Sequence, residues 1–251
     1  RNDVLRATPN YIFTLDEGLP EEDSAELEEI PSDESGEEET IPSATSSDPN
    51  TTQYVLNKMQ LPQAWNLTTG SPTVTVGVLD SGIDPNHEDL KANLNTSLGQ
   101  NYTDDGLAAW TDPVGHGTHV AGIIGAVGNN GKGIAGVCWN VKLVSLRVFK
   151  RTYDENGNIK GTGKMDWVVD AVKYAINHQI PIINYSGSGN SQNKTLRDAI
   201  SNYPGLLVCS AGNGKDHDNN DKTPNIPVDM DTDSLKFYPA CYPNDNIISV
   251  A

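Results

Sequence analysis

The chain has 251 residues, with 34 Asp or Glu and 17 Lys or Arg, and a formal net charge of −17. This length suits one sizeable hydrophobic core with room for an appendage. No run of about 18 apolar residues occurs, so no membrane span is visible, and the lack of a basic stripe disfavours a nucleic-acid partner.

The N-terminal part of the chain divides into two segments. Residues 1–15, RNDVLRATPNYIFTL, form a short apolar, strand-like piece. Between Asp16 and Glu39 there are 13 acidic residues and no Lys or Arg, which leaves 21 acids against 17 bases elsewhere. Residues 16–53 have too few apolar side chains to offset the entropy of ordering them, so we predict a disordered acidic linker. A cation-binding or partner-docking tail is the alternative.

From residue 54 onward, apolar strands alternate with helices. We expect helices at 54–70, 116–128, 164–178 and 193–204, and strands at 73–80, 141–149, 180–186, 205–213 and 246–251. Continuous apolar strands of this kind are buried on both faces of a sheet. The pattern therefore predicts an α/β fold: a doubly wound, mostly parallel sheet with helices on both faces. Ligands bind such sheets beyond the carboxyl ends of the strands.

Three polar residues lie where such a sheet binds ligands. Asp80 closes a strand in VTVGVLDSGID, a position that binds metal, ribose or phosphoryl groups in various α/β enzymes. His116 opens a helix in GHGTHVAG, and it is either a metal ligand with His119 or a proton carrier whose tautomer Asp80 fixes. His119, one turn further on, fits a structural histidine better. Asn213 ends LLVCSAGN, where its side chain either stabilises an oxyanion or caps a turn.

The order of these motifs is more specific than any one of them. VLDSGID, HGTHVAG and SAGN resemble the signatures of the subtilisin-like serine peptidases (subtilases), over residues from about 54 to the end. The resemblance implies a serine endopeptidase in which Asp80 orients His116, His116 is the general base and Asn213 stabilises the oxyanion. The GTSMA-like serine motif of the family is missing. We therefore expect 54–251 to be the N-terminal two-thirds of a catalytic domain, incomplete at its C-terminus, in a precursor fragment that is inactive alone.

The resemblance also implies a polypeptide substrate held as an extended strand between two strands of the enzyme. The matching segments are KGTGK and NYSGSGN, and Gly187 stands where the family more often has a bulky apolar residue, which suggests a wider or flatter pocket. Ordinary flexible loops are the alternative interpretation. The expected substrate-binding residues are Gly161, Gly163, Ser186, Gly187, Ser188, Ser210, Ala211 and Gly212.

A structural calcium site is implied by the same resemblance. Its ligands would be Asp89, Asn130 and the carbonyls of Lys132 and Ile134, since hard oxygen ligands suit calcium. A solvated Asn-Gly turn would give the same sequence pattern. The acidic loop 214–234 lacks the residues of an EF-hand, and we interpret it as a solvated insertion.

The N-terminal piece resembles the last strand of a subtilase propeptide. Residues 1–15 would then end a propeptide that acts as an intramolecular inhibitor, and the acidic segment would span the processing junction. The family also implies an exported protein, extracellular or at the cell surface. Two alternatives are a non-catalytic, peptide-binding subtilase-like pseudoenzyme and a phosphotransferase or metal hydrolase that uses Asp80 and Asp84. Cys138, Cys209 and Cys241 are expected to be small buried residues, with a Cys209–Cys241 disulfide as the alternative.

Overall fold

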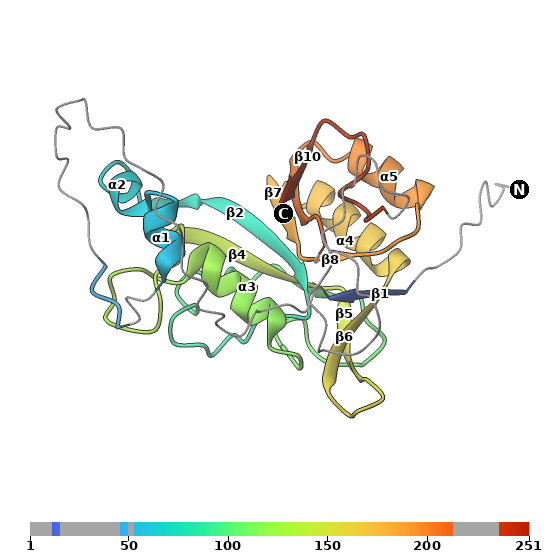
Figure 1. Cartoon of the computed structure of the whole chain (residues 1–251), viewed down its shortest axis with the longest axis horizontal. Coiled ribbons are helices and arrows are strands. Elements are labelled where there is room, and N and C mark those ends of the chain that lie inside the picture. The colour runs from blue at the N-terminus through green and yellow to red at the C-terminus, as the bar shows by residue number, and fades with distance from the viewer. Residues whose placement is uncertain (1–11, 16–45, 50–52, 213–235, 251) are drawn as a thin grey trace, which may run out of the picture.

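The computed structural model describes residues 12–15, 46–49, 53–212 and 236–250. A six-stranded sheet, in the order β10–β9–β7–β2–β4–β3, forms the centre of this part of the chain (Figure 1), and its neighbouring strands are all paired in parallel. Its strands are β2 (Gly70–Asp80), β3 (Gln100–Asn101), β4 (Asn140–Arg147), β7 (Ile182–Tyr185), β9 (Leu206–Ser210) and β10 (Ile247–Val250). The predicted mostly parallel α/β sheet is confirmed.

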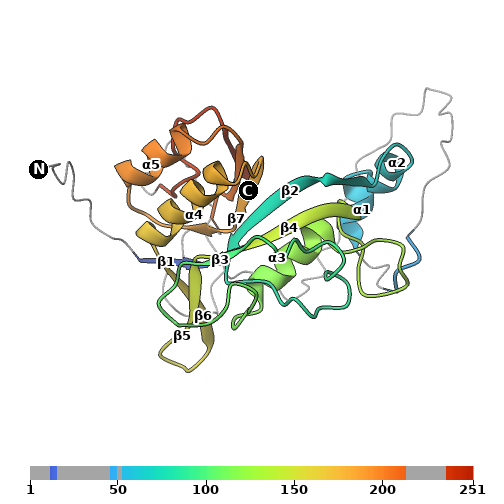
Figure 2. The same ribbon diagram turned by 180° about the vertical axis from the view of Figure 1, so that it is seen from behind.

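The principal helices cover opposite faces of this sheet. In both Figure 1 and Figure 2, α3 (His116–Gly125) lies on one side of β2 and β4, and α4 (Met165–Asn177) and α5 (Lys194–Ser201) lie on the other. Because side chains alternate along a strand, Val76 and Val78 pack in the cluster with α3, whereas Leu79 packs in the cluster with α4 and α5. Burial on both faces explains why the strands read as continuous apolar runs.

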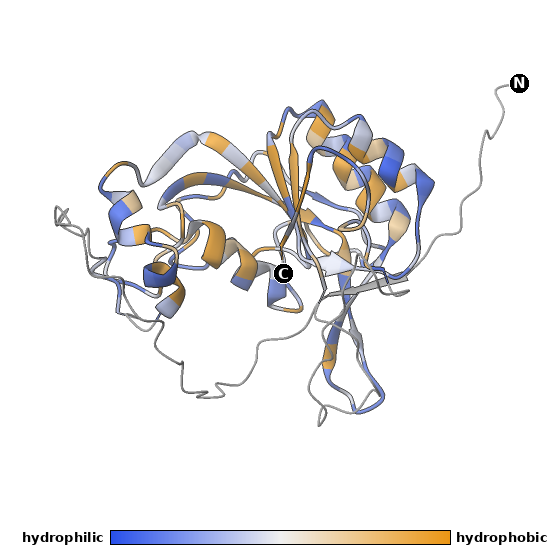
Figure 3. Ribbon diagram, turned by 45° about the horizontal axis from the view of Figure 1, so that its top comes forward, coloured by the Kyte–Doolittle hydropathy of each residue, from blue (hydrophilic) through white to orange (hydrophobic). Residues whose placement is uncertain are grey.

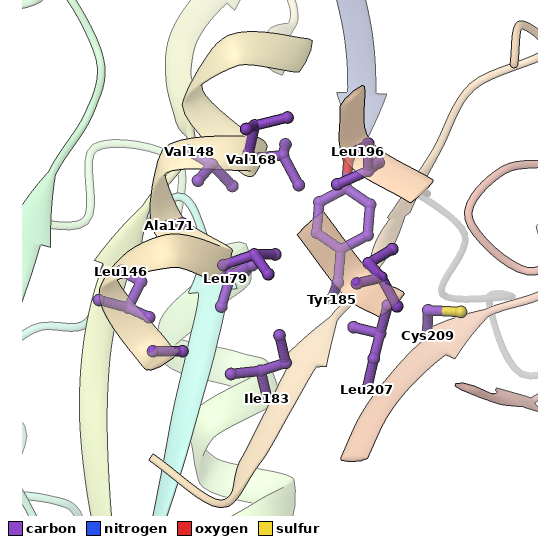
Figure 4. Packing of buried hydrophobic residues seen from close by; sticks show 14 of the residues in the cluster. Leu79, Leu146, Val148, Val168, Ala171, Ile183, Tyr185, Leu196, Leu207 and Cys209 are labelled. Atoms are coloured by element: carbon purple, nitrogen blue, oxygen red, sulfur yellow. The ribbon is translucent and has the colours of Figure 1, made fainter. Parts of the chain in front are cut away.

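The larger core lies between the sheet and the helices α4 and α5. Figure 4 shows Leu79 and Leu146 of the sheet facing Val168 and Ala171 of α4. The hydropathy colouring in Figure 3 shows hydrophobic central strands, with hydrophilic turns on the outer helices. At the start of α5 the Asn193 side chain accepts a hydrogen bond from the Leu196 amide, so this helix has a side-chain cap.

A second, antiparallel sheet lies beside the first. Its order is β5–β6–β1–β8, with β5 (Phe149–Tyr153), β6 (Ile159–Lys164), β1 (Ile12–Leu15) and β8 (Gly187–Ser188). The β5–β6 hairpin projects from the body in Figure 1, and the periodicity of the sequence did not indicate it. The strand β1 comes from the last four residues of the N-terminal piece, and it lies between β6 and β8.

The N-terminal connection to the sheet also differs from expectation. The single helix predicted over 54–70 is two short helices, α1 (Tyr54–Lys58) and α2 (Leu61–Trp65), separated by Gln60 in a left-handed conformation with φ of 54°. Most of the acidic segment and the loop 214–234 lie outside the described residues. Asp48 lies within the predicted linker, but its carboxylate is buried and accepts hydrogen bonds from the amides of three consecutive residues, so this end of the segment packs against the domain.

Two further expectations concern cysteines and membranes. None of Cys138, Cys209 and Cys241 is in a disulfide; Cys209 is buried as expected, whereas the other two are partly exposed. The alternative Cys209–Cys241 disulfide is therefore not formed. Among the described residues, no helix combines the length and the apolar character that crossing a bilayer requires.

Candidate active site

Asp80 and His116 meet at the carboxyl end of the central sheet. Asp80 is the last residue of β2 and His116 is the first residue of α3, and Nδ1 of His116 lies 2.8 Å from Oδ1 and 3.0 Å from Oδ2 of Asp80. The Asp80 side chain is fully buried, whereas one-fifth of the His116 side chain is exposed. The backbone amide of Ser81 donates a second hydrogen bond to Asp80 Oδ1, at 2.7 Å.

Glycines let the helix approach this closely. A Cβ atom on Gly117 would overlap the carbonyl oxygen of Gly82 and lie 3.0 Å from Cβ of Asp80. Gly82 itself has φ of 125°, which L side chains rarely adopt. The glycine after His116 and the glycine in the DSG turn therefore both serve the contact between the acid and the imidazole.

Burial and hydrogen bonding change the pKa of Asp80 in opposite directions, and the net effect is a raised pKa. Removal from water raises the pKa of the Asp80 carboxyl, and the nearby charge of Asp112 adds to this; the hydrogen bonds from His116 and Ser81 lower it. A carboxylate that accepts the Nδ1 proton fixes the tautomer in which Nε2 carries a lone pair. The pair can therefore take a proton at Nε2 and stabilise the imidazolium that results.

The other strand ends lie at the same edge as Asp80. Leu79, Tyr185 and Cys209 are paired across β2, β7 and β9, so Ser210, the last residue of β9, lies at the level of Asp80. Ala211 donates its amide to the Val250 carbonyl at 2.7 Å, and Gly212 has φ of 91° and faces Phe237. Asn213 lies outside the described residues, so its place as oxyanion donor stays a prediction.

The structure brings the two predicted substrate segments together around β1. Thr14 pairs with Thr162 on β6 and with Ser188 on β8, Phe13 pairs with Gly163, and Leu15 pairs with Gly187. Both pairings are antiparallel. Gly161 belongs to the same strand as Gly163, and Ser186 precedes β8, where its hydroxyl accepts a hydrogen bond from the Asn184 side chain at 2.9 Å. These segments are strands of one sheet, and the flexible-loop alternative is not supported.

Gly187 does not widen the cleft. A Cβ atom at this position would lie 2.6 Å from Cζ of Phe149, whose ring is fully buried and stacks on Tyr185 with centroids 5.9 Å apart. A Cβ atom on Gly163 would likewise lie 2.9 Å from the Phe149 ring. The interpretation of a wider or flatter pocket is therefore corrected, because an aromatic ring fills the space that a bulkier residue at 187 would need.

Of the other three expected calcium ligands, Asn130 and Ile134 contact the buried carboxylate of Asp89. Asp89 is 1% exposed; its Oδ1 accepts a hydrogen bond from the Asn130 side chain at 2.8 Å, and its Oδ2 accepts one from the Ile134 amide at 3.0 Å. The Lys132 amide donates to Oδ1 of Asn130 at 2.8 Å. No cluster of three or more His, Cys, Asp or Glu suited to a metal ion occurs within the described ranges.

Two other predicted positions have different surroundings from those expected. His119 is exposed on α3, and its role as a structural histidine stays a prediction. Asp84 is also exposed, and its carboxylate accepts a hydrogen bond from the Asn86 amide at 2.9 Å, as in an Asx turn. The Asp80 carboxylate accepts hydrogen bonds from His116 and Ser81. Asp80 and Asp84 therefore do not form the metal or phosphoryl site that the phosphotransferase or metal-hydrolase alternative requires.

Two of the residues that support the pair, Asp112 and Arg147, were not predicted from the sequence. Ser81 contacts both the Asp80 turn and the start of α3, Asp112 receives several hydrogen bonds at that start, and Arg147 lies behind the turn with no exposed surface. The spacing of four residues between Asp112 and His116 was a usable signal, because Asp just before a helix commonly accepts the free amides of its first turn. Nothing local in the sequence marks Arg147.

Comparison with known proteins gives relatives that align over most of this chain. An intracellular serine protease of Paenibacillus polymyxa is 36% identical over 198 residues, which cover 76% of this chain and 53% of that protein. The major intracellular serine protease of Bacillus subtilis (strain 168) is 35% identical over 177 residues, or 68% of this chain and 52% of that protein. The minor extracellular protease Epr of the same strain is 33% identical over 182 residues, or 71% of this chain and 25% of that protein.

These comparisons correct the expected location. We expected an extracellular or cell-surface protein from the general habit of the family, but the relatives at 36% and 35% identity are both named intracellular, although Epr is named extracellular. Membership of the family does not determine location, because relatives named intracellular and a relative named extracellular both match this chain.

The chain spans about half the length of the first two relatives, which are both named serine proteases. Their names give no support to the non-catalytic alternative. The family model described as Subtilase family matches residues 71–251, a stretch that begins in β2 and includes Asp80, His116 and the strands on both sides of β1. The chain therefore belongs to the subtilase family.

Proposed function

We propose that the whole protein is a serine endopeptidase in which Asp80 and His116 activate a serine hydroxyl that lies outside these 251 residues. The observation that carries the proposal is the hydrogen bond of 2.8 Å between His116 Nδ1 and the buried Asp80 in a chain of the subtilase family. His116 would take the hydroxyl proton at Nε2 and return it to the leaving amine, while Asp80 stabilises the imidazolium. Asn213 would donate to the oxyanion.

The test uses the protein extended through the proposed serine. It should hydrolyse a peptide amide and react covalently with a fluorophosphonate probe, which labels activated serine hydroxyls. His116→Ala should abolish both reactions while the circular dichroism spectrum stays unchanged, and His119→Ala, an exposed change one turn along the same helix, should leave both intact. Equal labelling of the His116→Ala variant would refute the assignment of His116 as the base.

We also propose that β1 acts as an intramolecular inhibitor. An extended substrate would have to add a strand between β6 and β8, and β1 takes this place in the structure, paired with both. The glycines at 163 and 187 stand opposite β1, where a side chain would collide with Phe149. The support is the position of the β1 backbone, which occupies the edges of β6 and β8 that an extended substrate would join.

Proline at residue 14 tests this inhibition. Thr14 pairs on both sides, and Thr14→Pro removes the amide hydrogen from a strand in the middle of the sheet, a position that proline does not tolerate. A labelled peptide NYIFTL should therefore bind the Thr14→Pro chain at least tenfold more tightly than the wild-type chain. Asn10→Pro is the control, because it introduces the same residue two positions before β1 begins. Equal peptide affinity of wild type and Thr14→Pro would refute the inhibitor role.

We further propose that Asp89 and its neighbours hold a structural calcium ion. Oxygen atoms of Asp89, Asn130, Lys132 and Ile134 belong to one compact loop region, and a buried carboxylate suits a hard cation. Both Asp89 oxygens accept hydrogen bonds in the structure, from Asn130 Nδ2 and from the Ile134 amide, so a bound cation requires the Asn130 carboxamide to rotate and present its oxygen. Calcium should raise the melting temperature of the wild type and not of Asp89→Asn; equal shifts would refute the site.

A further inference from the structure

Asp112 accepts an unusual number of hydrogen bonds for a partly exposed side chain. It lies on the loop before α3, four residues ahead of His116. Its carboxylate is the acceptor for donors from both sides of the active site. Oδ1 accepts from Ser81 Oγ (2.7 Å), the Val114 amide (3.1 Å) and the Gly115 amide (2.8 Å), and Oδ2 accepts from the amide (2.8 Å) and Oγ1 (2.7 Å) of Thr118.

These contacts join the two segments that carry the acid and the base. Ser81 directly follows Asp80, and its hydroxyl oxygen also accepts a hydrogen bond from the Gly117 amide at 3.0 Å. Gly117 in turn directly follows His116. The chain of contacts therefore runs from the Asp80 turn through the Ser81 hydroxyl to both Asp112 and the first turn of α3.

The first turn of α3 depends on these acceptors. The amides at the start of a helix have no partner within the helix, and the residue at the N-cap position of α3 is Gly115, which has no side chain to cap them. Asp112 serves this purpose from three residues further back. Hydrogen bonds to an ionised carboxylate are about twice as strong as neutral ones, so Asp112 holds the turn firmly.

We propose that Asp112 is a positioning residue: through Ser81 and the amides of α3, it holds Asp80 and His116 at hydrogen-bonding distance. This inference rests on the proposed function. Asp80 and His116 are 36 residues apart in sequence, so only noncovalent contacts fix the 2.8 Å between them. Small displacements of catalytic groups cost large factors in rate, on the order of 100-fold for 1 Å.

Two variants and a matched control separate positioning from simple stabilisation. Asp112→Asn keeps the size of the side chain but replaces one acceptor oxygen with a donor, and Ser81→Ala removes only the bridging hydroxyl. Asp154→Asn is the control: its carboxylate accepts hydrogen bonds from the Asn156 and Asn158 amides on the β5–β6 hairpin, away from Asp80 and His116.

The first measurement uses the 251-residue chain and needs no catalysis. With ¹⁵N-labelled histidine, the Nδ1-bound proton of His116 should give a slowly exchanging resonance in the wild type. We expect its exchange with water to be at least tenfold faster in Asp112→Asn and Ser81→Ala and unchanged in Asp154→Asn. If Asp112→Asn fails to fold, Ser81→Ala alone decides. Unchanged exchange in the folded variants would overturn the inference.

The second measurement uses the catalytic protein extended through the proposed serine. Both variants should lower kcat by about 10- to 100-fold with KM within twofold, because the substrate strands β6 and β8 are untouched. Unchanged kcat in Asp112→Asn would overturn the inference. If the wild type itself shows no hydrolysis, the proposed function fails, and the exchange measurement still decides the positioning role.

Discussion

Arg147→Met is the sharpest test of how the site is supported. Arg147 is the last residue of β4, paired with Asp80 in the sheet, and it has no exposed surface. Its Nε donates to the Ser81 carbonyl at 2.8 Å, Nη2 donates to Asp105 Oδ2 at 2.7 Å, and Nη1 donates at 3.3 Å to Asp105 Oδ1 and to the Ala108 carbonyl. The guanidinium thus holds the turn after Asp80 and the loop that leads to α3.

The expected loss of stability follows from these contacts. Removal of one partner from a buried ion pair costs about 3–5 kcal/mol. Asp105 remains 18% exposed and keeps a hydrogen bond from the Leu107 amide, so the lower end, about 3 kcal/mol, applies. For a domain of about 200 residues, each kcal/mol lowers the melting temperature by about 2–4 °C, so we expect a decrease of about 6–12 °C.

Thermal unfolding followed by circular dichroism measures this effect. Lys194→Met is the matched control, because it breaks an exposed pair with Asp198 on α5 and should cost no more than about 0.5 kcal/mol. A melting temperature of Arg147→Met within 1–2 °C of this control would refute the reasoning.

The pH dependence gives a second readout of the same pair. The Arg147 hydrogen bonds hold the pKa of Asp105 well below its ordinary value of 3.8, against a desolvation effect that raises it. A carboxyl with a lowered folded pKa stabilises the fold above its unfolded pKa, and this stability is lost as the pH falls through the folded value. The difference between wild type and Arg147→Met should therefore be full at pH 6 and shrink below about pH 4.

Three other predictions concern the cleft, a helix cap and a surface carboxylate. Gly187→Leu should lower stability by about 1–3 kcal/mol because its Cβ collides with Phe149, and Phe149→Leu in the same chain should restore part of it in urea unfolding. Asn193→Ala should cost about 1 kcal/mol by removing the cap of α5, measured in the same way. Hydrogen bonds from Lys150 and Lys164 lower the pKa of Asp104 to about 2. Replacing both lysines with Met should return this pKa toward 3.8 in a carboxyl NMR titration.

Local patterning was enough to predict five of the six strands of the main sheet and the helices α3, α4 and α5, but not the two-residue strand β3. The apolar runs ending at Asp80 and Ser210 match β2 and β9, because a strand covered on both faces needs an apolar residue at nearly every position. The 3–4 spacing of apolar residues in α4 likewise follows from a single buried face. The order of Asp80 and His116, with the resemblance it carries, predicted the acid and the base.

Such patterns do not predict contacts between segments that are distant in the sequence. Phe149 fills the space beside Gly187, although 38 positions separate them, and β1 joins β6 across about 150 residues. Arg147 and Asp112 are residue types that usually lie on the surface. Only folding buries Arg147 fully and places Asp112 between the segments that carry Asp80 and His116. Sequence alone was enough to predict which residues would carry the proposed chemistry, because residue type and strand position are local. The tertiary structure decided what holds them in place, because burial and hydrogen-bond partners exist only once remote segments have packed together.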